Sequence, residues 1–192
     1  MKEAAKLIPV GFNHNTVPVS RALPDMDLFN LDAKSIVYNE LSKAEYQVGT
    51  LGGGNHFIEV QKGDDGYIWI MIHSGSRNLG YTVAKHYNEV AKKLNSTYHS
   101  VVTPEMELAF LPINTKEAKD YMEEMKYCVE FAKQNRFLML DRMKDAFNSV
   151  IGMSFTCDII NESHNFVAWE NHFHKNVLVH RKGATQAIKG QL

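Results

Sequence analysis

The clearest pattern of hydrophobic and polar positions lies within residues 49–80. Two strand-like runs, residues 56–61 (HFIEVQ) and 67–73 (YIWIMIH), are separated by KGDDG at residues 62–66, which contains the Gly and Asp residues that favour tight turns. This pattern predicts an antiparallel hairpin that carries one histidine at the outer end of each strand.

The turn sequence also predicts how the two strands pair. A hairpin centred within the Asp-Asp pair of the turn places His56 directly opposite His73, with Cβ atoms about 4.5–5.5 Å apart on one face. The two imidazoles are then close enough to share a metal site, and Ile70 and Ile72 face the core. A shift of one residue would separate the histidines. If Glu59 lines the same pocket as His56, the strand must bend or begin after His56.

Apolar residues recur at helical spacing in three further segments, residues 30–46, 79–94 and 116–150. The last segment is the longest and predicts either one helix or two in tandem. Its predicted apolar stripe comprises Tyr121, Met125, Val129 and Ala132. Residues 154–160 and 177–180 are compatible with short strands. Together these elements predict an α+β fold in one domain over residues 1–192, with antiparallel strand pairs carrying a metal site and helices packed outside.

The amino-acid composition limits the kinds of protein that this chain can be. The chain has 192 residues, 44% of them hydrophobic, which is enough for a sizeable core. Its 21 basic and 22 acidic residues nearly balance, so any contact with nucleic acid must be local. The two cysteines, Cys128 and Cys157, are too few for a disulfide framework. No signal peptide or apolar run of membrane length is found, which predicts a cytoplasmic protein without membrane contact.

The residues around the two hairpin histidines suit the binding of anions and metals. The glycines at 52–54 can bring backbone N–H groups close to a ligand, and residues 74–77 (SGSR) add two hydroxyls and a guanidinium. The spacing alone is equally consistent with a glycine-bordered hairpin whose histidines are simply hydrogen-bonded. A further pair, His172 and His174, lies in a segment predicted to be a solvated polar loop.

Four segments resemble the RtcB-type RNA ligases, the GTP- and manganese-dependent enzymes of tRNA splicing and RNA repair. They are GTLGGGNHFIEVQ (49–61), HSGSRNLG (73–80), SHN (163–165) and HRKGAT (180–185). Each is weak alone, but in this order they are jointly specific, and the similarity covers most of the chain. The resemblance implies that three histidines bind a pair of manganese ions; in this sequence they are His56, His73 and His164.

The resemblance also implies a guanine-nucleotide site and an RNA site. The positions that match the family's GTP pocket are Asn55, Phe57 and Glu59, where the carboxylate accepts hydrogen bonds from the guanine edge, and Asn165, which contacts the phosphates. Arg77 matches a position associated with RNA phosphate binding, and Lys182 matches a basic residue of the active-site region. The implied partners are RNAs with broken ends, such as tRNA halves or damaged RNA.

The family reaction joins a 3′-phosphate or 2′,3′-cyclic phosphate RNA end to a 5′-hydroxyl end. A histidine takes GMP from GTP and passes it to the RNA 3′-phosphate, after which the 5′-hydroxyl displaces GMP. The sequence resembles the central part of such a ligase. The metal-binding Asp and Cys are expected before Met1 and the guanylylated histidine beyond Leu192, so no residue here is assigned as catalytic. The chain alone is expected to be inactive, and flanking segments of the ligase are potential partners.

Three interpretations remain open at this point. The chain is a piece of an RtcB-type ligase, as a fragment, half of a split gene or a shortened relative. Alternatively, three histidines with an open coordination position serve a metal-dependent phosphoesterase. Alternatively, the chain is a non-catalytic remnant that binds metal, GTP or RNA.

Overall fold

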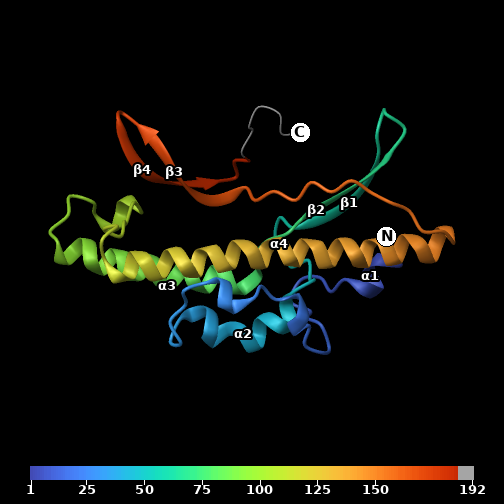
Figure 1. The fold of residues 1–192 in the computed structure, drawn as a ribbon, viewed down its shortest axis with the longest axis horizontal. Helices are drawn as coiled ribbons and strands as arrows, with labels where there is room; N and C mark the ends of the chain where they lie inside the picture. Colours follow the sequence, from blue (N-terminus) through green and yellow to red (C-terminus); the bar gives the residue numbers. More distant parts are fainter. Residues whose placement is uncertain (186–192) are drawn as a thin grey trace. The chain divides into compact units, whose positions relative to one another are not determined.

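The computed structural model of the chain describes residues 1–185 (Figure 1). Residue contacts divide the chain into two compact units, Met1–Phe155 and Thr156–Leu192, and each is described by itself. The described residues form helices and two antiparallel strand pairs, so the α+β prediction is confirmed. That residues 1–192 form a single domain stays a prediction. No helix in the described part is long and apolar enough to cross a membrane.

The first unit contains the helices and one hairpin. Its α-helices are α1 (Ala4–Leu7), α2 (Ile36–Gln47), α3 (Arg77–Thr97) and α4 (Lys116–Ile151). Short 3-10 helices occur at Ser20–Ala22, Met26–Leu28 and Pro104–Met106. The predicted hairpin is formed by β1 (Phe57–Lys62) and β2 (Ile68–His73), which pair antiparallel. The helix predicted over residues 79–94 corresponds to α3, which extends further at both ends.

Side-chain caps determine where two of these helices begin. The Ser35 hydroxyl accepts a hydrogen bond from the backbone N–H of Tyr38 (3.2 Å), so α2 starts later than predicted. Thr115 caps α4 in the same way, through the N–H of Ala118 (3.2 Å). Gly152, with φ of 70°, provides the left-handed residue that ends α4. The segment predicted as one helix or two in tandem is therefore a single helix.

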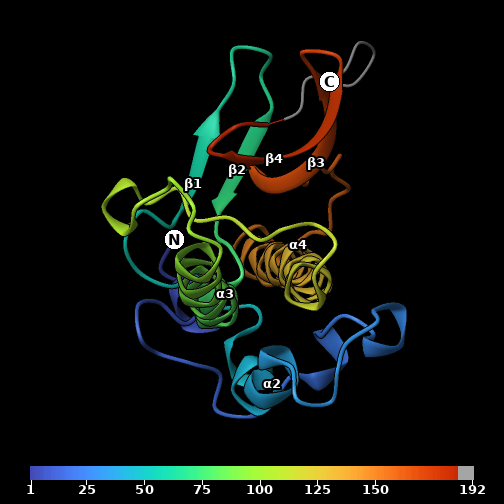
Figure 2. The ribbon, with the colours of Figure 1, turned by 90° about the vertical axis from the view of Figure 1, so that its left-hand side faces the viewer.

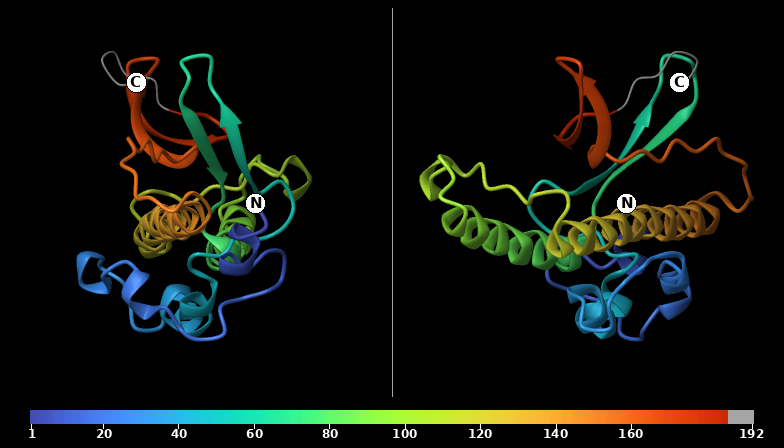
Figure 3. Two further views of the ribbon diagram at one scale, coloured as in Figure 1. Left: turned by 90° about the vertical axis from the view of Figure 1, so that its right-hand side faces the viewer. Right: turned by 60° about the vertical axis from the view of Figure 1, so that its left-hand side comes forward.

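α4 links the two hydrophobic clusters of the first unit (Figure 1). Its N-terminal half packs with α2 and α3, where Tyr127 and Phe131 are fully buried. Its C-terminal half packs with α1 and with one face of the hairpin through Met139 and Met143. Figure 2 and Figure 3 show α3 beside α4, with α2 and the β1–β2 hairpin on opposite sides of them. The hairpin is thus held directly on the longest helix.

The buried face of α4 differs from the predicted stripe. Three of the predicted positions are only partly buried, namely Tyr121, Met125 and Val129. The helix instead buries Glu124, Tyr127, Cys128, Phe131, Asn135 and Met139. The prediction was right for Ala132, which is buried, and wrong for the other three positions. Two residues of the buried face, Glu124 and Asn135, are polar and do not contribute to a hydrophobic pattern. Glu124 is paired: it accepts hydrogen bonds from the N–H of Val37 (3.0 Å) and the hydroxyl of Tyr87 (2.8 Å).

The cysteines do not form a disulfide. Cys128 is buried in α4, where burial raises the pKa of its thiol to about 12, whereas Cys157 is exposed. Cys128 therefore acts as a small core residue.

The described part of the second unit contains a hairpin of β3 (Asn165–His172) and β4 (Lys175–Lys182), and the short strand predicted at 177–180 lies within β4. Phe173 and His174 form its two-residue turn, with φ of 52° and 61°. His172 is therefore the last strand residue and does not lie in the predicted loop. Residues 154–160 form no strand, because they have no paired segment to supply the interstrand hydrogen bonds.

Candidate functional site

The β1–β2 hairpin pairs one residue away from the predicted register. His73 lies opposite Phe57 rather than His56. The cause is the turn: the N–H of Gly63 donates to the carbonyl of Tyr67 (2.8 Å), so the reversal is centred on Asp65 instead of between two residues. The prediction that His56 and His73 lie directly opposite each other was therefore wrong.

The two imidazoles nevertheless lie together. Their ring centroids are 5.7 Å apart. His56 immediately precedes β1, so its side chain need not follow the alternation of the strand. The strand begins after His56, which is one of the two arrangements expected if Glu59 and His56 line one pocket. The pairing puts Glu59 and Phe57 on the same hairpin face as His73, and the Phe57 ring meets the His73 ring edge-on at 5.3 Å. The opposite face carries Ile58, Ile70 and Ile72, which pack against the α4 cluster, as predicted for the last two.

A backbone carbonyl orients the His56 ring. The Nδ1 atom of His56 lies 2.9 Å from the carbonyl oxygen of Leu51, and because a carbonyl only accepts, Nδ1 must carry the proton. The same oxygen accepts a hydrogen bond from the Ser74 hydroxyl (2.8 Å), directly after His73 in the chain. When the imidazole is neutral, its lone pair is therefore on Nε2, as in a metal-ligating histidine whose other nitrogen is bonded to the protein.

Arg77 ties the loop before His56 to the start of α3. Its guanidinium donates hydrogen bonds to the Thr50 hydroxyl (3.0 Å) and to the carbonyls of Gly11 (3.3 Å) and Leu51 (3.5 Å). Its backbone φ of 55° is a left-handed conformation that costs a residue with a Cβ about 1–2 kcal/mol. Burial lowers the pKa of the guanidinium, which still remains charged at neutral pH. Binding of RNA phosphate by Arg77 stays a prediction.

In the second unit, strand pairing brings two of the sequence motifs together. Asn165, the first residue of β3, lies opposite Lys182 of β4. The Asn165 side chain accepts a hydrogen bond from the N–H of Gly183 (3.0 Å), and the carbonyl of His164 accepts one from the N–H of Ala184 (3.0 Å). The SHN and HRKGAT segments thus form one end of the second hairpin, although no strand was predicted at residues 165–172.

Comparison with known proteins identifies the family. The sequence model described as tRNA-splicing ligase RtcB matches residues 15–192, most of the chain. The chain belongs to the RtcB family. The recognition made from the four motifs is confirmed.

Three relatives show how much of an RtcB protein the chain represents. It is 34% identical over 151 residues to the RNA-splicing ligase RtcB of Escherichia coli K12, covering 75% of this chain and 36% of that protein. The tRNA-splicing ligase RtcB of Archaeoglobus fulgidus is 35% identical over 164 residues (74% and 34%), and that of Aeropyrum pernix 30% over 182 residues (82% and 37%). The chain spans about a third of the length of these relatives.

Side chains of α4 form hydrogen bonds to the loops that carry the RtcB motifs of the first unit. The sequence did not single out these side chains as part of the site. Asn135 is fully buried and bonds to both loops, before His56 and after His73. The guanidinium of Arg142 donates to the carbonyl of Gly49 (2.6 Å) and to the Asn15 side chain (2.8 Å). One feature of the sequence could have indicated Asn135: it is a polar residue at an apolar position of the α4 spacing, one helical turn from Met139.

The predicted site residues are divided between the two units. His56, His73, Phe57 and Glu59 share one end of the first hairpin, with the exposed Asn55 just before it. His164, Asn165 and Lys182 belong to the second unit. Among residues 1–185, no group of three or more His, Cys, Asp and Glu side chains that could hold a metal is found. The ligand and nucleotide roles stay predictions.

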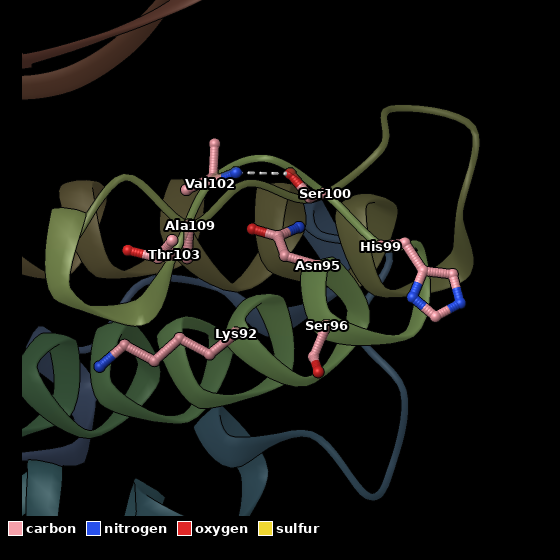
Figure 4. A pocket seen from close by; sticks show the side chains of 8 residues that line it. All are labelled: Lys92, Asn95, Ser96, His99, Ser100, Val102, Thr103 and Ala109. Atoms are coloured by element: carbon pink, nitrogen blue, oxygen red, sulfur yellow. Dashed lines mark hydrogen bonds between the residues drawn. The ribbon is translucent and has the colours of Figure 1, made fainter.

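A pocket lies elsewhere in this RtcB chain. It has a volume of about 410 Å³ and is formed around the C-terminal end of α3 (Figure 4). Asn95 reaches from α3 toward the following segment, where its amide bonds to the backbone N–H (3.0 Å) and carbonyl (2.8 Å) of Phe110. None of the predicted site residues lines this pocket. Its side chains hold the end of α3 rather than the motif loops.

Proposed function

We propose that this chain supplies the metal- and guanine-nucleotide-binding part of an RNA ligase of the RtcB type. Its substrates are broken RNAs, such as tRNA halves or damaged RNA, in the cytoplasm, and the reaction joins a 3′-phosphate or 2′,3′-cyclic phosphate end to a 5′-hydroxyl end. The observation that carries the proposal is the His56–His73 pair, whose rings lie 5.7 Å apart at the meeting point of two RtcB motifs.

The side chains of the first unit fit a transition metal such as manganese. Imidazole nitrogens are suitable ligands for such ions, and because Nδ1 of His56 is bonded to the Leu51 carbonyl, Nε2 is the nitrogen that would bind the metal. A Cβ at Gly75 would lie 3.9 Å from that Nε2 atom, so the absence of a side chain there keeps space beside it. His56 and His73, with His164 from the second unit, are the proposed ligands. Manganese would neutralise phosphate charge and orient oxygens.

The proposed guanine site is the outer face of β1. Glu59 is an exposed carboxylate on the same face as Phe57 and His73, and it accepts hydrogen bonds from the two N–H groups of the guanine edge. Adenine lacks this pair of donors. We therefore propose that Glu59 selects GTP over ATP, that Asn55 and Phe57 complete the base pocket, and that Asn165 contacts the phosphates, with Lys182 and Arg77 on the RNA.

GTP binding and covalent labelling together test this function. The purified chain, with manganese and α-phosphate-labelled GTP, is expected to bind GTP in preference to ATP without retaining label after denaturation, because no assigned residue acts as the nucleophile. Glu59→Gln should weaken GTP binding about tenfold and leave ATP binding unchanged, since a charged acceptor is lost. Asp64→Asn, at the exposed tip of the same hairpin, is the matched control.

Two outcomes would contradict the proposal. Equal affinity for GTP and ATP in the wild-type chain would remove the guanine site and favour a metal-dependent phosphoesterase. Acid-labile label retained on the chain would show that a local histidine forms the adduct, with His180 and His174 the first residues to replace.

A further inference from the structure

The amide of Asn135 uses its full hydrogen-bonding capacity. Its oxygen accepts from the backbone N–H groups of Gly49 (2.6 Å) and Thr50 (3.1 Å). Its nitrogen donates to the Ser74 hydroxyl (3.1 Å) and to the Gly75 carbonyl (3.0 Å). An amide has two donor hydrogens and two acceptor lone pairs, so all are engaged. The partners also fix the orientation of the amide, because a flip would set its NH₂ group against two N–H donors.

These four contacts join two segments that lie far apart in the chain. Gly49 and Thr50 precede the glycine loop that leads to His56, and Ser74 and Gly75 directly follow His73. Asn135 is 85 and 86 residues from the first pair and 60 and 61 from the second. One side chain of α4 therefore sets the distance between the two loops.

A directed series of hydrogen bonds continues from Asn135 to the His56 ring. The Asn135 amide donates to the Ser74 hydroxyl, and that hydroxyl donates to the Leu51 carbonyl (2.8 Å). The same carbonyl accepts from Nδ1 of His56 (2.9 Å). Hydrogen bonds in such a series polarise and orient one another. Ser74, backed by Asn135, thus contacts the same Leu51 oxygen as the His56 ring, as does the Arg77 guanidinium (3.5 Å).

We propose that Asn135 is a positioning residue of the metal site: it holds the loops on either side of the His56–His73 pair and, through Ser74 and Leu51, keeps the His56 lone pair on Nε2. This rests on the proposed function insofar as the site binds metal. The orientation of the ring is a property of the metal-free chain and is tested separately.

Asn95 provides a control for the loss of a buried amide. It is 3% exposed, bonds to the backbone in both directions, and lies in the same unit at the far end of α3. If Asn135 served only general stability, Asn135→Ala and Asn95→Ala would have similar consequences. A positioning residue instead affects the ring of His56 and its metal affinity, which Asn95→Ala leaves unchanged.

The experiment combines nitrogen-15 NMR of the His56 ring in the metal-free chain, at mildly alkaline pH, with calorimetric titration of Mn²⁺. The wild type is expected to show the Nδ1–H tautomer. Asn135→Ala should give a mixture of tautomers and weaken Mn²⁺ binding at least about tenfold, as for other residues that orient metal ligands. Asn95→Ala should match the wild type in both measurements.

Two further variants keep the test decisive if Asn135→Ala does not fold. Ser74→Ala interrupts the series while Asn135 keeps its other three contacts, and it should show the same mixture of tautomers. Asn135→Asp keeps an acceptor for Gly49 and Thr50 but loses both donors, and should resemble Ser74→Ala. A wild-type tautomer in all folded variants would overturn the proposal. If the wild type shows the Nδ1–H form but binds no Mn²⁺, the proposed function fails while the positioning role is still decided by NMR.

Discussion

Replacing Gly52 by alanine is expected to lower the free energy of unfolding by about 2–5 kcal/mol and to displace the loop before His56. Gly52 has φ of 89°, where a residue with a Cβ is strained. That Cβ would also lie 1.6 Å from Nη1 of Arg77 and 2.8 Å from Nδ1 of His56, far inside van der Waals contact. Arg77 must therefore leave its contacts and the His56 ring must shift from Leu51, unless the loop itself moves.

Gly54→Ala is the control that separates the backbone strain of a positive φ from the steric clash of the new Cβ with Arg77 and His56. Gly54 lies in the same loop, with φ of 71°, and a Cβ there meets nothing within 4 Å. This control should lose only the conformational cost of about 1–2 kcal/mol. Urea denaturation of the two variants and the wild type measures the difference. Equal destabilisation by both substitutions would show that Arg77 and His56 do not lie where the structure places them.

Phe131→Ala is the second large effect expected, a loss of about 3–5 kcal/mol in the free energy of unfolding. The Phe131 side chain is fully buried in the cluster between α2, α3 and α4, so truncation leaves a cavity in the packing. The control is Phe12→Ala, since Phe12 is fully exposed and its removal should change stability by less than about 0.5 kcal/mol. Denaturation followed by circular dichroism would contradict the described core if the two variants were equally stable.

The hairpin shows how far local sequence determined this fold. The turn residues at 62–66 and the strand-like runs beside them sufficed to predict two antiparallel strands with a histidine at each outer end. They did not fix the register, because Gly and Asp favour reversals of several lengths, and here the reversal is centred on Asp65. The histidines still meet because His56 stands before the strand, where the backbone is free of the pleat.

The parts of the site that escaped prediction depend on distant contacts. Asn135 interrupts the apolar spacing of α4, and only the folded chain shows that its partners are loops at least 60 residues away. Similarly, β3 contains Asn165, Glu170 and His172, so its sequence does not alternate clearly, and its pairing with β4 is what defines it as a strand. Motif resemblance supplied the proposed site residues, whereas the contacts that hold the motif loops are seen only in the tertiary structure.

The central claim is that His56 and His73 form a metal-binding pair, and titration of Mn²⁺ tests it most directly. Calorimetry or paramagnetic broadening should show binding by the wild type and a loss of at least about tenfold in His56→Ala and in His73→Ala, since each removes one imidazole ligand. His14→Ala, which removes an exposed loop histidine, should bind like the wild type. Equal Mn²⁺ binding by the wild type and His73→Ala would contradict the claim.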